Sequence, residues 1–330
     1  MNRKVTLLYI SLACVLSLQA QTRQQMGGVY YAYPEGPSAK TGTFGTATYV
    51  MSDSLSVPQG YAPFYISHYG RHGSRWMPKD DRYVWICKHF EDESNLTPLG
   101  LQVKGMLQRV WENAKGNGGK LSKLGALQHQ GIAHRMFERY PQIFAAGNAV
   151  KARSSVADRC AKSMQAFTSE LHTLQPGLNL DVKTDSADMA WIAYVSPEVK
   201  ALENRTHVQA QVSPRRFLLQ LFKDVSKVDE PLKLMTEMHT VASSIQDVGL
   251  NFSSYPQDIE DGLNALFTDD EFRAIYDANN LRMTINNGTV ATNEDIPARS
   301  AISLWQNIEV EADRALRSVK SSATLRFGHD

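Results

Sequence analysis

The sequence has few cysteines and almost no net charge. Its 330 residues include three cysteines and carry a formal charge of +1. So few cysteines exclude a scaffold built on disulfides, and whether Cys87 pairs with Cys160 is left open. The near-zero charge provides no general attraction to nucleic acid or to an anionic membrane. We therefore expect no nucleic-acid partner, and any basic site must come from local clustering.

Long apolar runs are also scarce, and the prominent one stands at the start of the chain. Residues 1–20 read MNRKVTLLYISLACVLSLQA, with a basic beginning, an apolar stretch and Ala20 as a small residue for cleavage. The stretch is shorter than the ~20 residues that cross a bilayer, and we expect no membrane span elsewhere. This pattern predicts a signal peptide and a secreted or periplasmic protein. Lipid attachment at Cys14 is an alternative that the polar Ser11 disfavours.

Strand-like and helix-like segments alternate along much of the chain. Residues 64–69, 149–153 and 323–327 are rich in apolar, branched or aromatic side chains and predict buried strands. Apolar residues spaced by three and four predict amphipathic helices over 156–174 and 302–319. Such alternation predicts an α/β fold, in which ligands gather beyond the carboxyl ends of the strands.

The middle of the chain has a different character. Helical patterns dominate between about residues 180 and 299, so we interpret 181–299 as a mostly helical cap. The cap would be inserted into an α/β core formed by residues 21–180 and 300–330.

Two predicted helices begin with a capping-box pattern. Thr268 is followed three residues later by Glu271, and Ser155 is followed in the same way by Asp158. In such a box the hydroxyl accepts a hydrogen bond from a backbone amide of the first turn. The pattern predicts that helices begin directly after Thr268 and shortly after Arg153.

Basic side chains collect where the predicted strands end. The segment HYGRHGSRW contains Arg71, His72 and Arg75, while Arg153 and His329 end two other predicted strands. Guanidinium groups match phosphate oxygens in pairs and stay charged at every relevant pH. Any one of these residues alone would be interpreted as a solvated surface charge. Together, at three strand ends, they indicate a site for phosphate.

Two other kinds of site were weighed against phosphate. His68 and His72 are four residues apart, which aligns zinc ligands on a helix, but Gly70 between them argues against a helix. The stretch KGNGGK suggests a nucleotide-binding loop, yet Leu121 stands where such a loop needs Ser or Thr. We therefore expect neither a metal nor another cofactor.

Four short motifs carry a resemblance to a known family. RHGSR at residues 71–75 resembles the RHGxR signature of histidine acid phosphatases, and His329 with Asp330 resembles their HD motif. LGALQH at 124–129 and ARSS at 152–155, with Arg159 beyond, are similar to the family's LGxxQH segment and to the region of its third phosphate-binding arginine. The pattern, from about residue 62 onward, is most similar to bacterial relatives of multiple inositol polyphosphate phosphatase.

The resemblance implies a fold, an activity and a set of roles. The implied fold is a phosphoglycerate-mutase-like sandwich with a helical cap, and the implied activity is hydrolysis of phosphomonoesters, inositol polyphosphates above all, without a metal cofactor. His72 would be the nucleophile that forms a phosphohistidine, and Asp330 would protonate the leaving oxygen. The phosphate oxygens would be held by Arg71, Arg75, Arg153 and His329.

Two departures and two alternatives accompany the resemblance. Met77 stands where the fuller signature has proline, and the family continues past its HD motif whereas this sequence stops at Asp330. We therefore expect the sequence to be part of a longer protein. The alternatives are a broad acid phosphatase acting on sugar phosphates or other small esters, and an inactive protein that binds phosphate.

Overall fold

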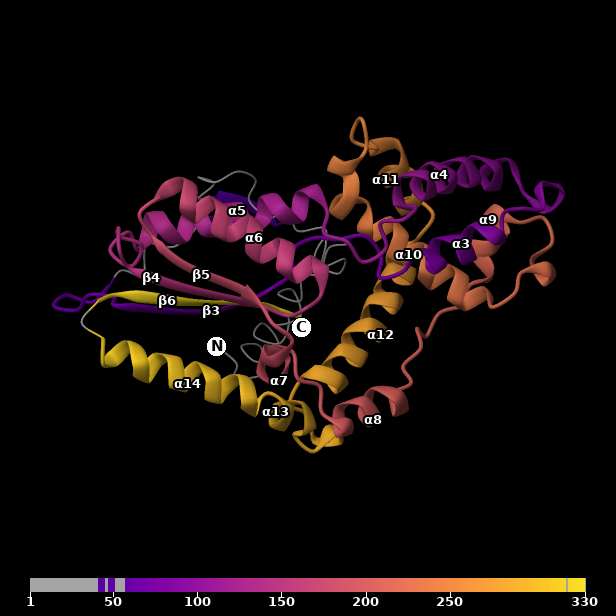
Figure 1. The fold of residues 1–330 in the computed structure, drawn as a ribbon. Coiled ribbons are helices and arrows are strands. Elements are labelled where there is room, and N and C mark those ends of the chain that lie inside the picture. Colours follow the sequence, from indigo (N-terminus) through magenta and orange to yellow (C-terminus); the bar gives the residue numbers. More distant parts are fainter. Residues whose placement is uncertain (1–40, 45–46, 51–56, 319, 330) are drawn as a thin grey trace, which may run out of the picture.

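The computed structural model describes residues 41–44, 47–50, 57–318 and 320–329. The expected signal peptide over 1–20, including Cys14, lies outside these residues, and so does Asp330. None of the helices that the structure describes has the length and apolar character needed to cross a membrane. Figure 1 shows a half built on a sheet and a half built of helices.

A four-stranded parallel sheet forms the first half, with the strand order β3-β6-β4-β5. Three of its strands are the expected ones: β3 (Tyr65–Arg71), β4 (Ala149–Ser154) and β6 (Ser322–Gly328). The edge strand β5 (Asn179–Thr184) was not expected, because the segment falls at the start of the predicted helical cap. Leu180 and Val182 alternate with polar residues, as in a strand, but most of the residues are exposed. A separate antiparallel hairpin joins β1 (Thr41–Phe44) to β2 (Ala47–Val50).

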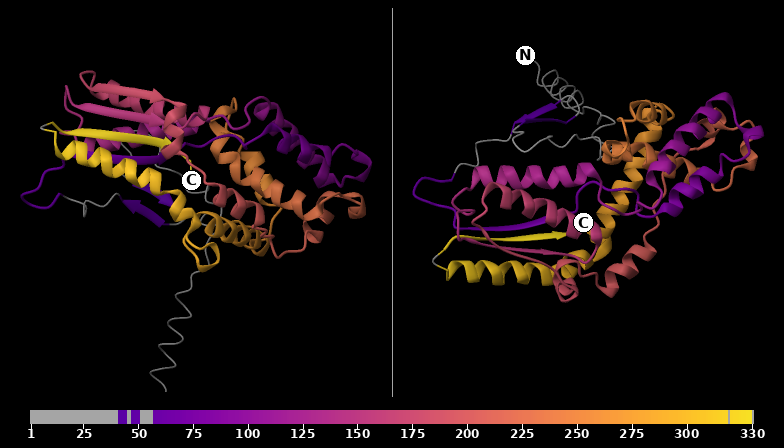
Figure 2. Two further views of the ribbon diagram at one scale, coloured as in Figure 1. Left: turned by 60° about the horizontal axis from the view of Figure 1, so that its bottom comes forward. Right: turned by 45° about the horizontal axis from the view of Figure 1, so that its top comes forward.

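Helices cover both faces of the sheet (Figures 1 and 2). On one face lie α5 (Lys123–Arg139) and α6 (Asp158–Leu174). On the other lie α7 (Met189–Ile192) and α14 (Ile302–Leu316). The core between the sheet and α6 is apolar, as the spacing of 156–174 predicted, and includes Ala152, Phe167, Leu171, Leu325 and Phe327. The predicted α/β class with a central sheet between helices is confirmed.

The apolar stripe of α14 does not face the sheet. Trp305 and Leu316 are exposed, whereas the face that contacts the sheet carries the polar residues Asn307 and Glu311. The reason is Arg326, which is fully buried in β6 and donates from Nε to Asn307 Oδ1 at 2.9 Å. A buried guanidinium requires polar partners, so the polar side of α14 is turned inward.

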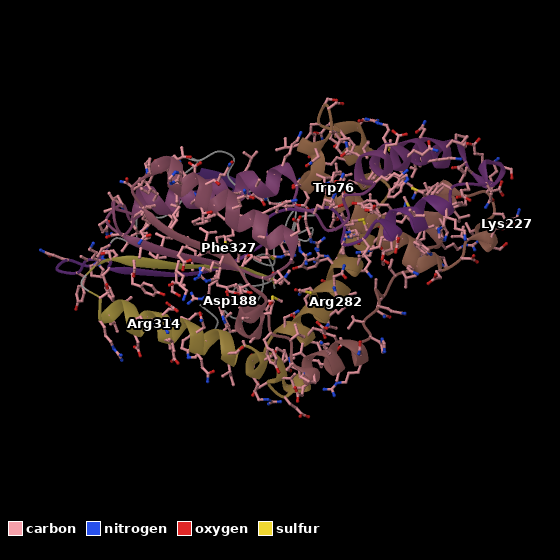
Figure 3. The ribbon with its side chains drawn as sticks, viewed as in Figure 1. Trp76, Asp188, Lys227, Arg282, Arg314 and Phe327 are labelled. Atoms are coloured by element: carbon pink, nitrogen blue, oxygen red, sulfur yellow. The ribbon has the colours of Figure 1, made fainter. Side chains whose placement is uncertain are left out.

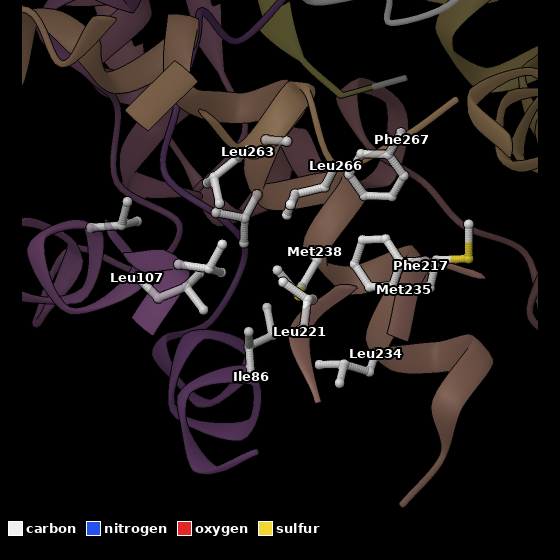
Figure 4. Close-up of a cluster of buried hydrophobic side chains, with 14 of the residues drawn as sticks. Ile86, Leu107, Phe217, Leu221, Leu234, Met235, Met238, Leu263, Leu266 and Phe267 are labelled. Atoms are coloured by element: carbon white, nitrogen blue, oxygen red, sulfur yellow. The ribbon is translucent and has the colours of Figure 1, made fainter. Parts of the chain in front are cut away.

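The helical half combines two parts of the sequence. Its apolar cluster (Figure 4) draws on α3 (Asp80–Lys88) and α4 (Pro98–Ala114) as well as on the expected cap. The division into domains expected from the sequence places α3 and α4 in the α/β core, but their buried side chains pack against cap helices. The cap helices in this cluster are α9 (Arg215–Leu221), α10 (Pro231–Val248), α11 (Gln257–Asn264) and α12 (Asp269–Asn287).

Shorter elements complete the chain. Near α12, α8 (Pro197–Arg205) and α13 (Ile296–Ser300) form a small cluster of their own. Single 3-10 turns occur at Glu93–Asn95, Ser186–Asp188, Val225–Lys227, Gly249–Asn251 and Ala291–Asn293.

One of the two predicted capping boxes is present. Thr268 and Glu271 form both hydrogen bonds of the box at the start of α12. The box at Ser155 was a wrong prediction, because α6 begins two residues later, with Ala157 at its N-cap and no side-chain hydrogen bond from that cap. The Ser155 hydroxyl instead contacts a histidine at the candidate site described next.

Candidate active site

Three parallel strands deliver their following residues to one edge of the sheet. The register places Arg71 of β3 beside Gly328 of β6, and Phe327 of β6 beside Ser154 of β4. The backbone amide of His72 then donates to the carbonyl of Gly328 at 3.1 Å, and the amide of Ser155 donates to the carbonyl of Phe327 at 2.9 Å. The expected gathering of His72 and His329 at the carboxyl ends of these strands is therefore what the structure shows.

The basic loop, residues 71–75, lies directly on the first turn of α5. A Cβ atom on Gly73 would stand 2.4 Å from the carbonyl oxygen of Gly125, and one on Gly125 would stand 2.2 Å from the carbonyl oxygen of Ser74. Any side chain at either position would force the two backbones apart. Beyond the loop, Trp76 belongs to the cluster of the helical half, while Phe327 lies in the sheet (Figure 3). The basic loop thus joins the two halves.

Side chains of α5 and α6 fix the backbone of the basic loop. The amide of Ser74 donates to Gln128 Oε1 at 2.9 Å, and the amide of Gly73 donates to Ser163 Oγ at 3.1 Å. His129 forms a hydrogen bond with the backbone of Arg71. The segment LGALQH therefore has a structural explanation: its glycine permits the close contact, and its last two residues hold the loop.

His72 is presented as a neutral imidazole with one nitrogen available. The side chain is buried, and its Nδ1 lies 2.8 Å from the carbonyl oxygen of Gly73. A carbonyl only accepts, so Nδ1 carries the proton and Nε2 keeps its lone pair. Burial lowers the pKa of His72 from 6.5 to about 4, with Arg71, Arg159 and Arg75 adding to the decrease and the Gly73 hydrogen bond opposing it. Above that pH the ring is able to act as a nucleophile.

His329 is the second histidine of the site. Its ring centre lies 5.7 Å from that of His72. Arg159 Nη2 is 3.3 Å from Nδ1, and Ser155 Oγ is 3.0 Å from Nε2. A guanidinium only donates, so Nδ1 of His329 accepts and its Nε2 carries the proton. Cys160 of α6 lies next to His329, and its buried thiol donates to the carbonyl of Gly328 at 3.2 Å. Like Cys87, it is a free thiol.

Arg159 is the arginine that α6 brings to this pair of histidines. It lies in the first turn of α6, contacts His329 and contributes to the low pKa of His72. Its Nε is buried and has no hydrogen-bond partner among the residues that the structure describes. A donor of this kind beside two histidines suits an anion. The sequence contained a signal for it, because Arg159 follows the ARSS segment, but the strand-end argument favoured Arg153.

Arg153 lies on the opposite face of the sheet, which corrects its assignment to the phosphate site. Its Nη2 donates to Asp181 Oδ2 at 2.6 Å, and its Nε is 3.7 Å from a carboxylate oxygen of Asp188. Successive side chains of a strand point to opposite faces. Ala152 faces the core under α6, so its neighbour Arg153 is directed to the face that carries α7 and is paired with acidic residues there.

The residues considered for a zinc site and for a nucleotide-binding loop have other contacts in the structure. Within residues 57–318 and 320–329, no three His, Cys, Asp or Glu side chains gather in a way that could hold a metal ion. The ring of His68 packs against the rings of Phe167 and Phe327, with 5.7 and 5.9 Å between the ring centres. In the KGNGGK loop, the amides of Gly116 and Gly118 donate to the carboxylate of Asp80. These amides are therefore used within the protein, and the loop is a connection between α4 and α5.

Comparison with known proteins gives one curated relative and several similar folds. No family model matches the chain. The chain is similar to multiple inositol polyphosphate phosphatase 1 of Gallus gallus, with 23% identity over 212 residues that cover 62% of this chain and 46% of the relative. The chain therefore spans about half the length of the curated relative it matches.

The solved structures agree in fold. The multiple inositol polyphosphate phosphatase of Bifidobacterium longum, in complex with inositol hexasulfate, has a TM-score of 0.62 and 14% identity, covering 84% of this chain and 74% of that one. The phytase of D. castellii has a TM-score of 0.61 and 13% identity, covering 95% and 68%. The fold is therefore shared with these enzymes, and the chain is similar in sequence to multiple inositol polyphosphate phosphatase 1, in agreement with the resemblance that the motifs carry.

Proposed function

We propose that the protein containing this chain is a phosphoric monoester hydrolase that works through a phosphohistidine at His72. The observation that carries the proposal is the state of His72: a neutral ring, with its proton held at Nδ1 by Gly73, beside Arg71, Arg75 and Arg159. A nucleophilic nitrogen surrounded by guanidinium groups suits attack on a phosphoryl group, whose charge the arginines offset.

The first step transfers the phosphoryl group to the enzyme. His72 Nε2 forms a bond to phosphorus while the bond from phosphorus to the alcohol oxygen breaks. That oxygen leaves with the electron pair and takes a proton from Asp330, the residue that follows His329 in the sequence. A water molecule then attacks phosphorus and gives a proton to the Asp330 carboxylate, while the bond from phosphorus to Nε2 breaks and returns its electron pair to His72, releasing inorganic phosphate.

We assign the oxygen-binding roles to Arg71, Arg75, Arg159 and His329. Arg159 replaces Arg153 in this set, because Arg153 is paired with Asp181 on the other face of the sheet. His329 carries a proton at Nε2 and can donate it to a phosphate oxygen in place of Ser155. No metal enters any of these roles.

Inositol polyphosphates are the substrates we propose. This choice is supported by the similarity to multiple inositol polyphosphate phosphatase 1 and by a fold shared with a phosphatase in complex with inositol hexasulfate. We further propose that residues 1–20 direct the protein out of the cytoplasm, as a secreted or periplasmic enzyme. The N-terminal sequence of the mature protein tests this point, and an N-terminus at Met1 contradicts it.

The activity is tested with the full-length protein and two histidine variants. His72→Ala should abolish release of phosphate from inositol hexakisphosphate, because the other imidazole of the site, His329, has no lone pair available: its Nδ1 accepts from Arg159 and its Nε2 carries the proton. His172→Ala, an exposed residue in the last turn of α6, is the matched control and should keep wild-type turnover. Near-wild-type turnover by His72→Ala rejects the proposal. A wild-type preference for glucose 6-phosphate over inositol hexakisphosphate retains the chemistry but rejects the substrate class.

A further inference from the structure

We propose that Asp247, in the last turn of the cap helix α10, is a positioning residue that sets both the strength and the pH dependence of anion binding at the basic loop. This inference rests on the proposed function of the loop. It assigns a role to a carboxylate that neither the motifs nor the phosphoryl-transfer steps use.

The contact between cap and loop is made through Ser74. Ser74 Oγ donates to Asp247 Oδ1 at 2.6 Å, and Ser74 Oγ also accepts a hydrogen bond from Gln128 Nε2 at 3.0 Å. Gln128 also accepts from the Ser74 amide, so the hydroxyl is fixed from the side of α5 and its proton is directed at the carboxylate. Asp247 is therefore held at the residue that lies between Arg71 and Arg75 in the loop.

The charges around Asp247 are unequal on its two sides. Arg71 and Arg75 face it from the basic loop, and both lower its pKa. On the cap side it faces Tyr255, whose hydroxyl donates to Glu260 of α11 at 2.6 Å, and on the α5 side the uncharged Gln128 reaches it through the Ser74 hydroxyl. Burial outweighs the arginines and raises the pKa of Asp247 from 3.8 to about 6. The carboxyl group therefore changes charge near pH 6.

An anion in the basic loop would feel this change directly. Ionised Asp247 competes with the anion for Arg71 and Arg75 and repels it, whereas protonated Asp247 does neither. By linkage, an anion that binds better to the protonated form also raises the pKa of Asp247 and takes up a proton when it binds. Anion affinity should therefore increase as the pH falls through about 6.

A purely structural tether predicts a different result, and two variants separate the possibilities. Asp247→Asn keeps an acceptor oxygen for Ser74 and removes the charge. Glu237→Gln makes the equivalent change on the same helix, at a carboxylate that pairs with Arg82 of α3, and serves as the control. If Asp247 acts only through its hydrogen bond, Asp247→Asn and Glu237→Gln will behave alike.

Sulfate is the probe, because it remains a dianion from pH 5 to pH 8 and adds no titration of its own. Its binding to the full-length protein is measured by calorimetry across this range, in buffers of different ionisation enthalpy that report proton uptake. Wild type and Glu237→Gln should lose affinity as the pH rises through about 6, by roughly tenfold if the anion shifts the pKa by one unit. Asp247→Asn should bind more tightly than wild type at pH 8 and lose most of this dependence.

Equal pH dependence and proton uptake in wild type and Asp247→Asn would overturn the inference and leave the proposed function standing. A different result would reject both: sulfate that binds to Arg75→Ala as well as to wild type is not bound by the basic loop, so the loop is then not the anion site.

Discussion

The carbonyl oxygen of Gly125 lies where a side chain on Gly73 would begin, 2.4 Å from the position of its Cβ atom. The basic loop and α5 therefore fit together only with glycine on both sides. Since this contact involves backbone on each side, it cannot be relieved by a change of rotamer. It places the nucleophile His72 relative to the helix that supports it.

Gly125→Ala should therefore reduce kcat/KM by at least tenfold, because the new Cβ would stand 2.2 Å from the Ser74 carbonyl oxygen and displace the loop. Gly105→Ala is the control: a Cβ there meets no atom within 4 Å, and alanine stabilises a helix interior by roughly 0.5 to 1 kcal/mol relative to glycine. Steady-state kinetics and thermal unfolding of both variants check this. Unchanged kinetics in Gly125→Ala would show that the loop is free to move.

Replacing Arg159 by alanine should affect catalysis, whereas replacing Arg153 by alanine should affect stability. Arg159→Ala removes one charge-assisted contact to the phosphoryl group, worth ~1.5 to 3 kcal/mol, which corresponds to roughly a ten- to hundredfold decrease in kcat/KM. Arg153→Ala removes the partner of Asp181 on the other face and should lower the melting temperature with little change in kcat/KM. Kinetics and melting curves of the pair provide the measurement. A larger kinetic defect in Arg153→Ala would restore the strand-end assignment.

The stability of the fold should decrease with acidification below about pH 6.5. Burial lowers the pKa of both His68 and His129 from 6.5 to about 4, with a smaller contribution from Arg326 at His68 and from His68 at His129. Between these values the unfolded chain binds more protons than the folded one, so the free energy of unfolding falls as the pH falls. Each histidine contributes about one proton to this slope near pH 5.

His68→Phe tests the source of that slope. The ring of His68 packs against Phe167 and Phe327, and its buried Nε2 has no hydrogen-bond partner in the described part of the chain, so phenylalanine is a suitable replacement. Denaturant unfolding from pH 4.5 to pH 7 should show a slope reduced by about one proton in the variant. If the slope stays the same, His68 does not titrate on unfolding.

Asp330→Asn should affect substrates according to their leaving groups. The amide cannot deliver a proton, and general acid catalysis typically contributes ~10²- to 10⁴-fold. The loss should be large for inositol hexakisphosphate and small for nitrophenyl phosphate, whose leaving group is already acidic. Rates under conditions where chemistry limits turnover are to be compared for both substrates. Equal losses would assign Asp330 to positioning instead.

The strands of the site were predictable, and the direction of individual side chains was harder to predict. Apolar runs ending in Arg71 and His329 identified two strands and the edge where they meet. For Arg153 the register matters, because one step along a strand exchanges the two faces, and the alternation with Ala152 was the available signal. Ser155 looked like a helix cap because the capping pattern is local, whereas its hydrogen bond to His329 depends on the sheet.

The division into two halves was predictable only in part. The helical character of 181–299 was evident, but α3 and α4 join the same apolar cluster from an earlier part of the sequence. Sequence periodicity shows that a helix has an apolar face, not which partner covers it. Asp247 was missed for a related reason, because its role depends on the hydrogen bond from Ser74, which lies far away in the sequence.

The central claim, that His72 accepts the phosphoryl group, is tested most directly by trapping the phosphoenzyme. Full-length protein is mixed with labelled substrate, quenched within milliseconds in alkali, where phosphohistidine is stable, and digested for mass spectrometry. The account predicts a burst of label on the peptide that contains His72, at Nε2, because Nδ1 is bound to Gly73. Label on another residue, or turnover with no phosphoenzyme at any time, would contradict it.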